Sequence, residues 1–154
     1  MRGVRREPMS IRDQTGADLE AVLELWVAAW TATMPEIDFE RRRDWLARRL
    51  NEAQSAGARI LVATIENAIA GFVMIDPTTG YLDQIAVDPA RSREGIGTEL
   101  LRAAKSLSPG GVDLDVNVGN DPAVRFYEKN GFSITGEGVN ANSDRPVYRM
   151  SWRP

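Results

Sequence analysis

The amino-acid sequence predicts an α+β domain built on a mixed, mostly antiparallel sheet of about seven strands with four helices. Apolar residues recur at three- and four-residue spacing in three segments, which is the pattern of helices with one buried face, and an Asp-Pro start with a glycine stop marks a fourth helix. Other short runs are rich in β-branched residues and alternate with polar ones, as strands do. The runs at 81–87 and 112–118 are separated by a helical segment, so these two strands should lie parallel.

Composition restricts the class of protein and its partners. The chain has 154 residues, of which 43% are hydrophobic and 27% charged, as expected for one globular domain. We expect residues 1–8 to be a flexible leader and residues 9–154 to form a single domain. The formal net charge of −3 argues against a nucleic-acid partner and mildly favours an amine-bearing substrate over an acidic one. No run of 18 apolar residues occurs, so we expect a cytoplasmic protein without a membrane partner.

The sequence contains neither histidine nor cysteine. This composition excludes disulfides, thiol nucleophiles, imidazole bases and the usual zinc ligands, and we expect no metal. Proton transfer must therefore use carboxylates, tyrosine, lysine or water.

The first part of the chain is expected to hold one strand and two helices. A short strand precedes Thr15, which has the capping-box spacing to Asp18, and the helix that begins there should end near Trp30. Asp38 is expected to cap a second helix, which Gly57 closes. The arginine-rich stretch RRRDWLARR in this helix is interpreted as a solvated face, with phosphate binding as the less favoured alternative.

Strands and helices then alternate to the end of the chain. Strands at 59–65 and 68–75 flank Glu66-Asn67, a dipeptide that indicates a hairpin. The later expected elements are a strand at 81–87, a helix at 95–107, a strand at 112–118, a helix at 122–130 capped by Asp121, strands at 132–135 and 147–152, and a polar loop at 136–146.

The stretch YLDQIAVDPARSREGIGTELL, at 81–101, contains a candidate phosphate site. An apolar strand ends in a charged loop, which turns at Gly95-Ile96-Gly97 into a helix opened by Thr98. Unbonded backbone N–H groups at such a helix start, together with the helix dipole, favour an anion. An ordinary tight loop is the alternative, since the stretch lacks the third glycine of a dinucleotide fingerprint and the Gly-Lys-Ser/Thr of a P-loop.

Two motifs resemble those of the GCN5-related N-acetyltransferases, the GNAT superfamily. The first is the strand end Ile85-Ala86-Val87 with the loop pattern Arg/Gln-x-x-Gly-x-Gly/Ala, which reads SREGIG from Ser92 to Gly97. The second is Asn-x-x-Ala-x-x-Phe-Tyr-Glu-Lys-x-Gly-Phe, which reads NDPAVRFYEKNGF from 120 to 132. The element order from residue 9 to residue 152 also matches that fold, whose central parallel strands splay apart. In its cofactor motifs the chain partly resembles the ribosomal-protein alanine N-acetyltransferases.

The resemblance implies an N-acetyltransferase that moves an acetyl group from acetyl-CoA to a primary amine by direct attack. The acceptor is either a small-molecule amine or a peptide N-terminus, and the protein is a monomer or a homodimer. Ser92 departs from the usual Arg or Gln, but we expect retained binding because the phosphate contacts are mainly from the backbone. The implied cofactor-binding residues are Ile85, Ala86, Val87, Arg93, Glu94, Gly95, Ile96, Gly97, Thr98, Asn120 and Tyr127.

The same resemblance implies catalytic roles. Tyr127 matches the general acid that protonates the CoA thiolate, and the Ile85 region polarises the acetyl carbonyl. Two carboxylates compete as the base: Asp115, which is slightly favoured because it stands where the alanine acetyltransferases carry a Glu, and Asp83, expected on the same strand face as Ile85. The acceptor pocket is expected between residues 31–39 and 136–146.

Simpler interpretations remain for each of these residues. Without the surrounding motif, Tyr127 reads as a core aromatic, Asn120 as a turn or cap residue, and Asp83 and Asp115 as solvent-facing strand residues. For the whole chain, the alternative is a CoA-binding sensor or regulatory protein without turnover. The presence of Tyr127 and Asn120 favours the enzyme, because a sensor needs no acid for a thiolate.

Overall fold

The computed structural model describes residues 8–154. The leader expected at 1–8 therefore lies, apart from Pro8, outside the described residues. The helices and strands are β1 (Met9–Asp13), α1 (Leu19–Thr33), α2 (Arg43–Ser55), β2 (Arg59–Ile65), β3 (Ala68–Ile75), β4 (Leu82–Val87), α3 (Ile96–Leu107), β5 (Val112–Asn117), α4 (Asp121–Lys129), β6 (Ser133–Val139) and β7 (Pro146–Trp152). Short 3-10 turns precede α1 (Gly16–Asp18), α2 (Phe39–Arg42) and α3 (Pro89–Arg91).

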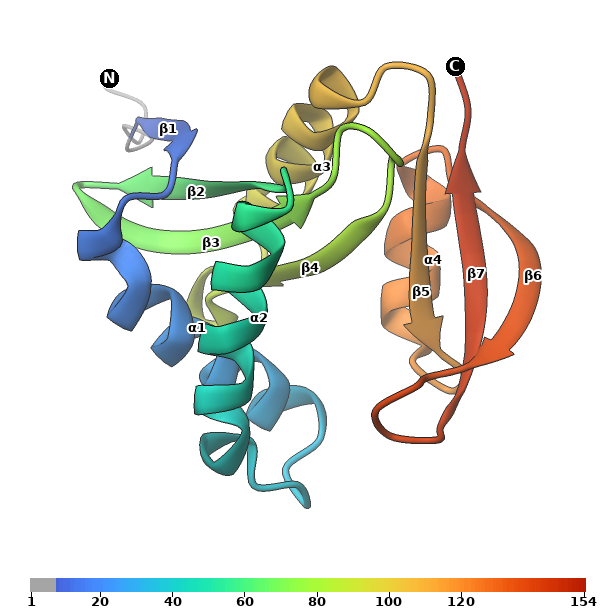
Figure 1. Cartoon of the computed structure of the whole chain (residues 1–154), viewed down its shortest axis with the longest axis horizontal. Coiled ribbons are helices and arrows are strands. Elements are labelled where there is room, and N and C mark those ends of the chain that lie inside the picture. Colours follow the sequence, from blue (N-terminus) through green and yellow to red (C-terminus); the bar gives the residue numbers. More distant parts are fainter. Residues whose placement is uncertain (1–7) are drawn as a thin grey trace, which may run out of the picture.

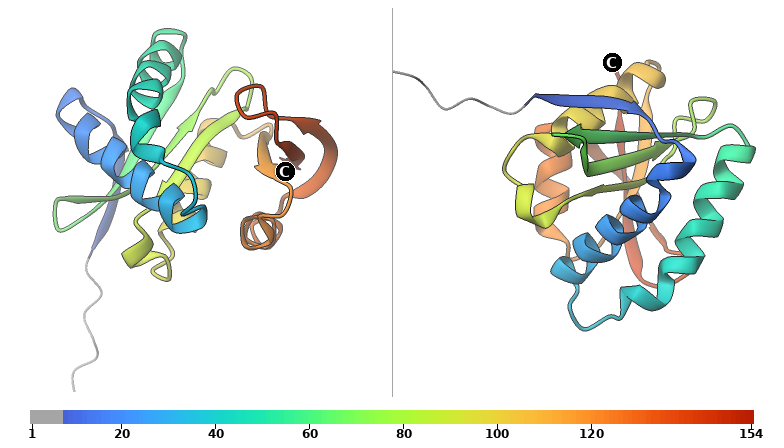
Figure 2. Two further views of the ribbon diagram at one scale, coloured as in Figure 1. Left: turned by 90° about the horizontal axis from the view of Figure 1, so that it is seen from below. Right: turned by 90° about the vertical axis from the view of Figure 1, so that its left-hand side faces the viewer.

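The strands form two antiparallel sheets, one in the order β1-β2-β3-β4 and one in the order β5-β7-β6 (Figure 1). In the first sheet, alternate residues of β2 and β3 point to opposite faces, and both faces are buried. Ile60, Val62 and Phe72 pack against α1 and α2, whereas Leu61 and Val73 pack in the core that contains α3. The helices therefore cover both faces of this sheet, as Figure 2 also shows.

The two sheets meet along β4 and β5 and then separate. The parallel contact between them is an isolated bridge between Tyr81 and Asp113, where the Asp113 N–H donates to the carbonyl of Gly80 at 2.9 Å. Beyond this bridge the two strands diverge toward their C-terminal ends (Figure 1). The predicted α+β fold with seven strands, four helices and a splayed parallel pair is confirmed, but the single predicted sheet is divided in two at this pair.

Local sequence signals account for several element ends. Thr15 and Asp18 form the expected capping box, in which the Asp18 carboxylate accepts from the Thr15 N–H at 2.7 Å. Arg12 also binds this carboxylate, and its hydrogen bond holds the pKa of Asp18 well below the usual range despite burial. Glu66 and Asn67 both adopt positive φ, at 51° and 66°, which suits the tight turn of the predicted hairpin.

Three predicted element ends were wrong. Asn120, not Asp121, is the N-cap of α4, because its side chain accepts from the Ala123 N–H at 3.3 Å. Asp38 makes no side-chain cap, since a 3-10 turn intervenes before α2. Much of the loop predicted at 136–146 is strand, because β6 is an exposed edge strand that lacks the alternation of buried residues from which strands are recognised.

Within the described part of the chain, no helix has the length and apolar character needed to cross a membrane.

Candidate active site

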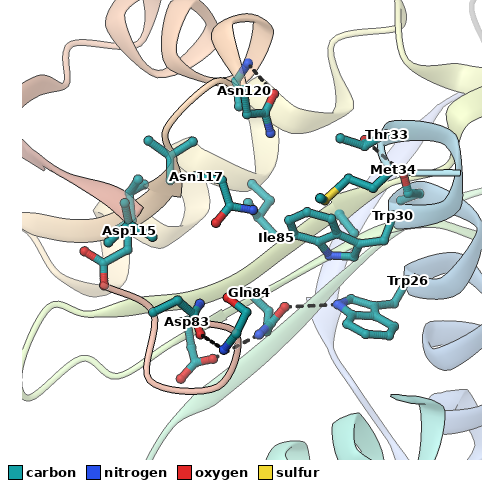
Figure 3. Close-up of a pocket in the computed structure, with 18 of the residues that line it drawn as sticks. Trp26, Trp30, Thr33, Met34, Asp83, Gln84, Ile85, Asp115, Asn117 and Asn120 are labelled. Carbon is teal, nitrogen blue, oxygen red and sulfur yellow. Dashed lines mark hydrogen bonds between the residues drawn. The ribbon is translucent and has the colours of Figure 1, made fainter. Parts of the chain in front are cut away.

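A cleft of about 750 Å³ opens where β4 and β5 separate. Figure 3 shows Trp30 and Met34 of the α1 segment on one side, Asp115, Asn117 and Asn120 on the other, and Ile85 between them. The strand residues Ile85, Ala86 and Val87, both candidate bases, Asn120 and Tyr127 all line this one cleft. Its size is within the range of small-molecule sites.

A β-bulge determines where Asp83 points. The β3–β4 register passes from Ile75 opposite Leu82 to Met74 opposite Gln84, which leaves Asp83 as the extra residue of β4. The sequence predicted that Asp83 lies on the same face of the strand as Ile85. This prediction was wrong, because the bulge breaks the alternation of the strand. The Asp83 carboxylate instead points toward α2, whereas Ile85 packs against the core that contains α3.

Asp83 is held by an arginine from α2. Arg49 Nε donates to Asp83 Oδ1 at 2.9 Å, and Arg49 Nη2 donates to Oδ2, which makes a bidentate pair. The Gln84 amide adds a hydrogen bond to Oδ1 at 3.2 Å and accepts one from Trp26 Nε1 at 3.1 Å. Because of the hydrogen bond to Asp83, the pKa of Arg49 is raised above its ordinary value. The stretch that contains Arg49 was predicted to be a solvated face, but Arg49 is only partly solvated, with 42% of its side chain exposed, because it pairs with Asp83.

Asp115 belongs to a second charged group at the same end of the cleft. Its Oδ2 accepts from the Tyr81 hydroxyl at 3.0 Å, and its Oδ1 accepts from Arg149 Nε at 2.8 Å. The Arg149 guanidinium also lies 5.6 Å from the centre of the Tyr81 ring. Burial, followed by the charge of Asp115, raises the pKa of Tyr81 to about 12, so its hydroxyl remains a proton donor at neutral pH.

Tyr127 closes the cleft from α4. The residue is only 8% exposed, and its ring packs against the rings of Phe126 and Phe132, at centroid distances of 5.3 and 5.7 Å. Burial raises the pKa of the Tyr127 phenol above its ordinary value, which keeps the group protonated. A protonated phenol that lines a cleft has the property required of a general acid.

The loop before α3 lies at the edge of the cleft, where Pro89 and Ser92 line it. The first backbone bond of α3 runs from the Glu99 N–H to the Gly95 carbonyl at 3.1 Å, so the N–H groups of Ile96, Gly97 and Thr98 have no intrahelical acceptor. The Glu94 N–H is already used, since it donates to the Arg91 carbonyl at 3.2 Å.

Glycine suits the two positions, Gly95 and Gly97, for different structural reasons. Gly95 adopts a positive φ of 77° and has open space around it, which a ligand can approach. At Gly97 a Cβ atom would lie 2.9 Å from the ring of Phe126, so glycine is required there for the packing of α3 against α4. The resemblance implied a cofactor-binding role for both glycines and did not reveal this packing contact.

On the side of α1 and the 3-10 turn before α2, the cleft has an aromatic wall. Trp30 stacks on Phe39 with ring centroids 5.6 Å apart, and Trp26 meets Phe39 edge-on at the same distance. The loop before β7 contributes Asn140 and Arg145 from the other side. Both segments expected to form the acceptor pocket therefore line the cleft. Among residues 8–154, no three acidic side chains are grouped closely enough to hold a metal ion.

The structure adds three residues that the sequence did not predict: Arg49, Tyr81 and Arg149. Arg49 follows Trp45 by one helical turn, so its place on the inner face of α2 was readable from the helical period. Arg149 lies opposite Asp115 in the β5–β7 register. That register could not be read from sequence, because a long excursion through α4 and β6 separates the two strands.

Comparisons with known proteins agree with this geometry. The model of the acetyltransferase (GNAT) family matches residues 19–132. The peptidyl-lysine N-acetyltransferase YiaC of Escherichia coli strain K12 is 31% identical over 142 residues, which are 92% of this chain and 95% of that protein.

Solved structures share the fold over nearly the whole chain. The apo form of YjaB from Escherichia coli has a TM-score of 0.75 at 27% identity and covers 94% of this chain and 97% of its own. The PaiA N-acetyltransferase from Thermoplasma acidophilum, determined in complex with coenzyme A, has a TM-score of 0.76 at 21% identity, with 96% and 99% covered. At 21% identity, the similarity to the PaiA structure supports the fold alone.

Proposed function

The chain belongs to the GNAT family of acetyltransferases, and from this premise we propose that it transfers the acetyl group of acetyl-CoA to the side-chain amine of a lysine in a peptide. The lysine acceptor is favoured by the name of the relative YiaC, a peptidyl-lysine N-acetyltransferase. A small-molecule amine and a peptide N-terminus, the acceptors expected from the sequence, are the competing possibilities.

One observation carries the proposal: a single cleft is lined by a buried, protonated tyrosine from α4 and by two carboxylates, Asp83 from β4 and Asp115 from β5. Acetyl transfer to an amine needs an acid for the leaving thiolate and an acceptor for the amine proton. Tyr127 is the proposed acid and Asp115 the proposed base. The chain has no histidine or cysteine that would offer a different pair.

The acyl donor is assigned to the groove between β4 and β5. Its pyrophosphate is assigned to the N–H groups of Ile96, Gly97 and Thr98, which have no intrahelical acceptor and lie at the positive end of the α3 dipole. The pantetheine arm runs along the backbone of Ile85 and Val87, beside Asn120. Ser92 is exposed at the edge of the cleft and can supply a hydroxyl where relatives of the family have Arg or Gln.

The proton transfers use the groups that line the cleft. The neutral amine attacks the acetyl carbonyl carbon, a C–N bond forms, and the carbonyl oxygen takes up negative charge next to the β4 backbone. Asp115 accepts the amine proton, directly or through a water. As the C–S bond breaks, Tyr127 donates its proton to the sulfur, and the phenol is reprotonated from solvent. The products are the acetylated amine and CoA with a free thiol.

The test is acetyl-CoA-dependent thiol release with three acceptors: a lysine peptide blocked at its N-terminus, a lysine-free peptide with a free N-terminus, and a small alkylamine. We expect the lysine peptide to be used best. Tyr127→Phe should lower kcat by about 100-fold, in the usual range for loss of a general acid, and leave the Kd for CoA unchanged.

The competing class, a CoA-binding sensor, makes a different prediction in the same assay. It would bind CoA but release no thiol above the uncatalysed rate with any of the three acceptors. An unchanged kcat in Tyr127→Phe would remove this residue from the mechanism even if turnover is seen.

A further inference from the structure

The cleft is lined by more positive than negative side chains. Its charged side chains are Arg42, Arg49, Asp83, Asp115 and Arg145. Arg49 is paired with Asp83, and Asp115 is paired with Arg149. Both carboxylates are thus neutralised by an arginine, and two cleft arginines are left over.

Arg42 and Arg145 make no ion pair with any acidic residue in the part of the chain that the structure describes, residues 8–154. Acidic partners are not scarce in this protein, which has a net charge of −3. The neighbours of Arg42 illustrate this, since Arg41 pairs with Asp38 at 3.8 Å and Arg43 pairs with Glu40 at 3.5 Å. The unpaired positive charge of the cleft is therefore a local feature that opposes the charge of the whole molecule.

The two arginines reach the cleft from different elements. Arg42 ends the 3-10 turn before α2, and its guanidinium lies 5.2 Å from the centre of the Phe39 ring, in the aromatic wall. Arg145 comes from the loop before β7 and also lines the adjoining hollow between Thr33 and Asn120. Glu36 lines that hollow too, but no ion pair joins it to Arg145. Arg42, through its contact with Phe39, and Arg145 therefore lie at the two segments expected to form the acceptor pocket, 31–39 and 136–146.

Guanidinium groups are suited to carboxylates, because their planar fork donates two parallel hydrogen bonds. We propose that the acceptor carries a carboxylate close to its reactive amine, and that Arg42 and Arg145 bind this carboxylate. The acceptor is then either a lysine with Asp or Glu beside it in a peptide, or a free amino acid whose own carboxylate is used. This inference rests on the proposed acetyl transfer. It also reverses the expectation, drawn from net charge alone, that the substrate is not acidic.

The experiment compares acceptors that differ only in one charge. The first pair is a blocked lysine peptide with Glu beside the lysine and the same peptide with Gln; the second is free lysine and lysine amide. We expect the acidic member of one pair to have a kcat/KM about tenfold or more above its neutral partner, as for hydrogen bonds to charged groups. Preference in the first pair identifies a peptide acceptor, and preference in the second identifies a free amino acid.

Variants test whether these two arginines cause the preference. Arg42→Gln and Arg145→Gln should each reduce the preference several-fold, and Arg145→Glu should favour the neutral acceptor. Arg48→Gln is the matched control, since Arg48 lies exposed on α2 outside the cleft and its loss changes net charge equally. The KM for acetyl-CoA should stay unchanged in all variants. The preference should also weaken with added salt, because both sites are open to solvent.

Three results would overturn the inference: equal use of acidic and neutral acceptors by the wild type, an equal loss of preference in Arg48→Gln, or an effect of Arg145→Gln confined to the KM for acetyl-CoA. Binding of the acetylated Glu and Gln peptides with CoA present, measured by calorimetry, separates this inference from the proposed function. Without turnover, tighter binding of the Glu peptide that depends on Arg42 and Arg145 would refute acetyl transfer and retain the carboxylate site. Equal binding of the two peptides, together with equal binding of acetylated lysine and its amide, would refute the carboxylate site.

Discussion

Asp83 and Asp115 line the same cleft but differ in how much of their bonding capacity is already used. Asp83 accepts two hydrogen bonds from Arg49 and one from Gln84, whereas Asp115 accepts one each from Tyr81 and Arg149. A carboxylate has about four lone-pair sites, so Asp115 keeps more of these sites without a hydrogen-bond partner. Its side chain is also more exposed, at 29% against 17% for Asp83. At the scale of residues, the geometry thus favours Asp115 as the base.

Paired substitutions test this assignment. Asp115→Asn should lower kcat by about 100-fold, because the amide cannot take the amine proton, while Asp83→Asn should lower it by about tenfold or less through disturbance of Arg49. Both replacements keep the side-chain shape, and the wild-type KM for acetyl-CoA is expected in each. Initial rates of thiol release with a saturating lysine peptide provide the measurement. A larger loss in Asp83→Asn would reverse the two roles.

At the scale of elements, the contact between α3 and α4 links the phosphate loop to the helix that holds Tyr127. Gly97→Ala would place a Cβ atom 2.9 Å from the Phe126 ring, and we expect it to lower the free energy of unfolding by about 1–3 kcal/mol, as overpacking does. Urea denaturation measures this change. Gly16→Ala is the control, because a Cβ there meets nothing within 4 Å.

A second substitution separates packing from phosphate binding. Phe126→Leu creates space at the same contact, so the double variant should recover part of the stability lost in Gly97→Ala, with a positive coupling between the two sites. If Gly97 is required only for packing, the double variant also recovers affinity for CoA. Persistent loss of CoA affinity in a stable double variant would mean that the phosphates themselves require the bare backbone at this position.

Helices and tight turns could be predicted from the sequence, because their signals are local. The 3.6-residue period located three of the four helices, and cap signals located the fourth. The Glu66-Asn67 turn and the Thr15–Asp18 capping box are local signals that the structure confirms. The bulge at Asp83, the pairing of Arg49 with that residue, and the position of Arg149 opposite Asp115 depend on how distant segments meet. No local pattern encodes such contacts. This is why the sequence located Ile85, Asn120 and Tyr127 in the cleft but not the partners of its charged residues, while the implied residues 93–98 do not line the cleft.

At the scale of the whole molecule, the two sheets share an isolated backbone bridge at Tyr81 and Asp113 and separate beyond it. A ligand that lies between β4 and β5 therefore contacts both sheets and resists their separation. Binding to the native state alone stabilises it by about 2.7 kcal/mol at a ligand concentration of 100 times Kd, or roughly 5–10 °C in Tm for a chain of this size. NAD and ATP, which lack the pantetheine arm, should produce little of this shift.

Hydrogen exchange locates the effect and so tests the argument. CoA should slow amide exchange in the C-terminal halves of both β4 and β5, because the arm assigned to the groove touches the two strands past their last shared bridge. The outer strands β1 and β6, at the far edges of the two sheets, serve as internal controls and should change little. Protection confined to the start of α3 would mean that the phosphates bind there while the splayed strands remain unoccupied. A rise in Tm with NAD or ATP but not with CoA would replace the acetyl-CoA groove with a nucleotide site.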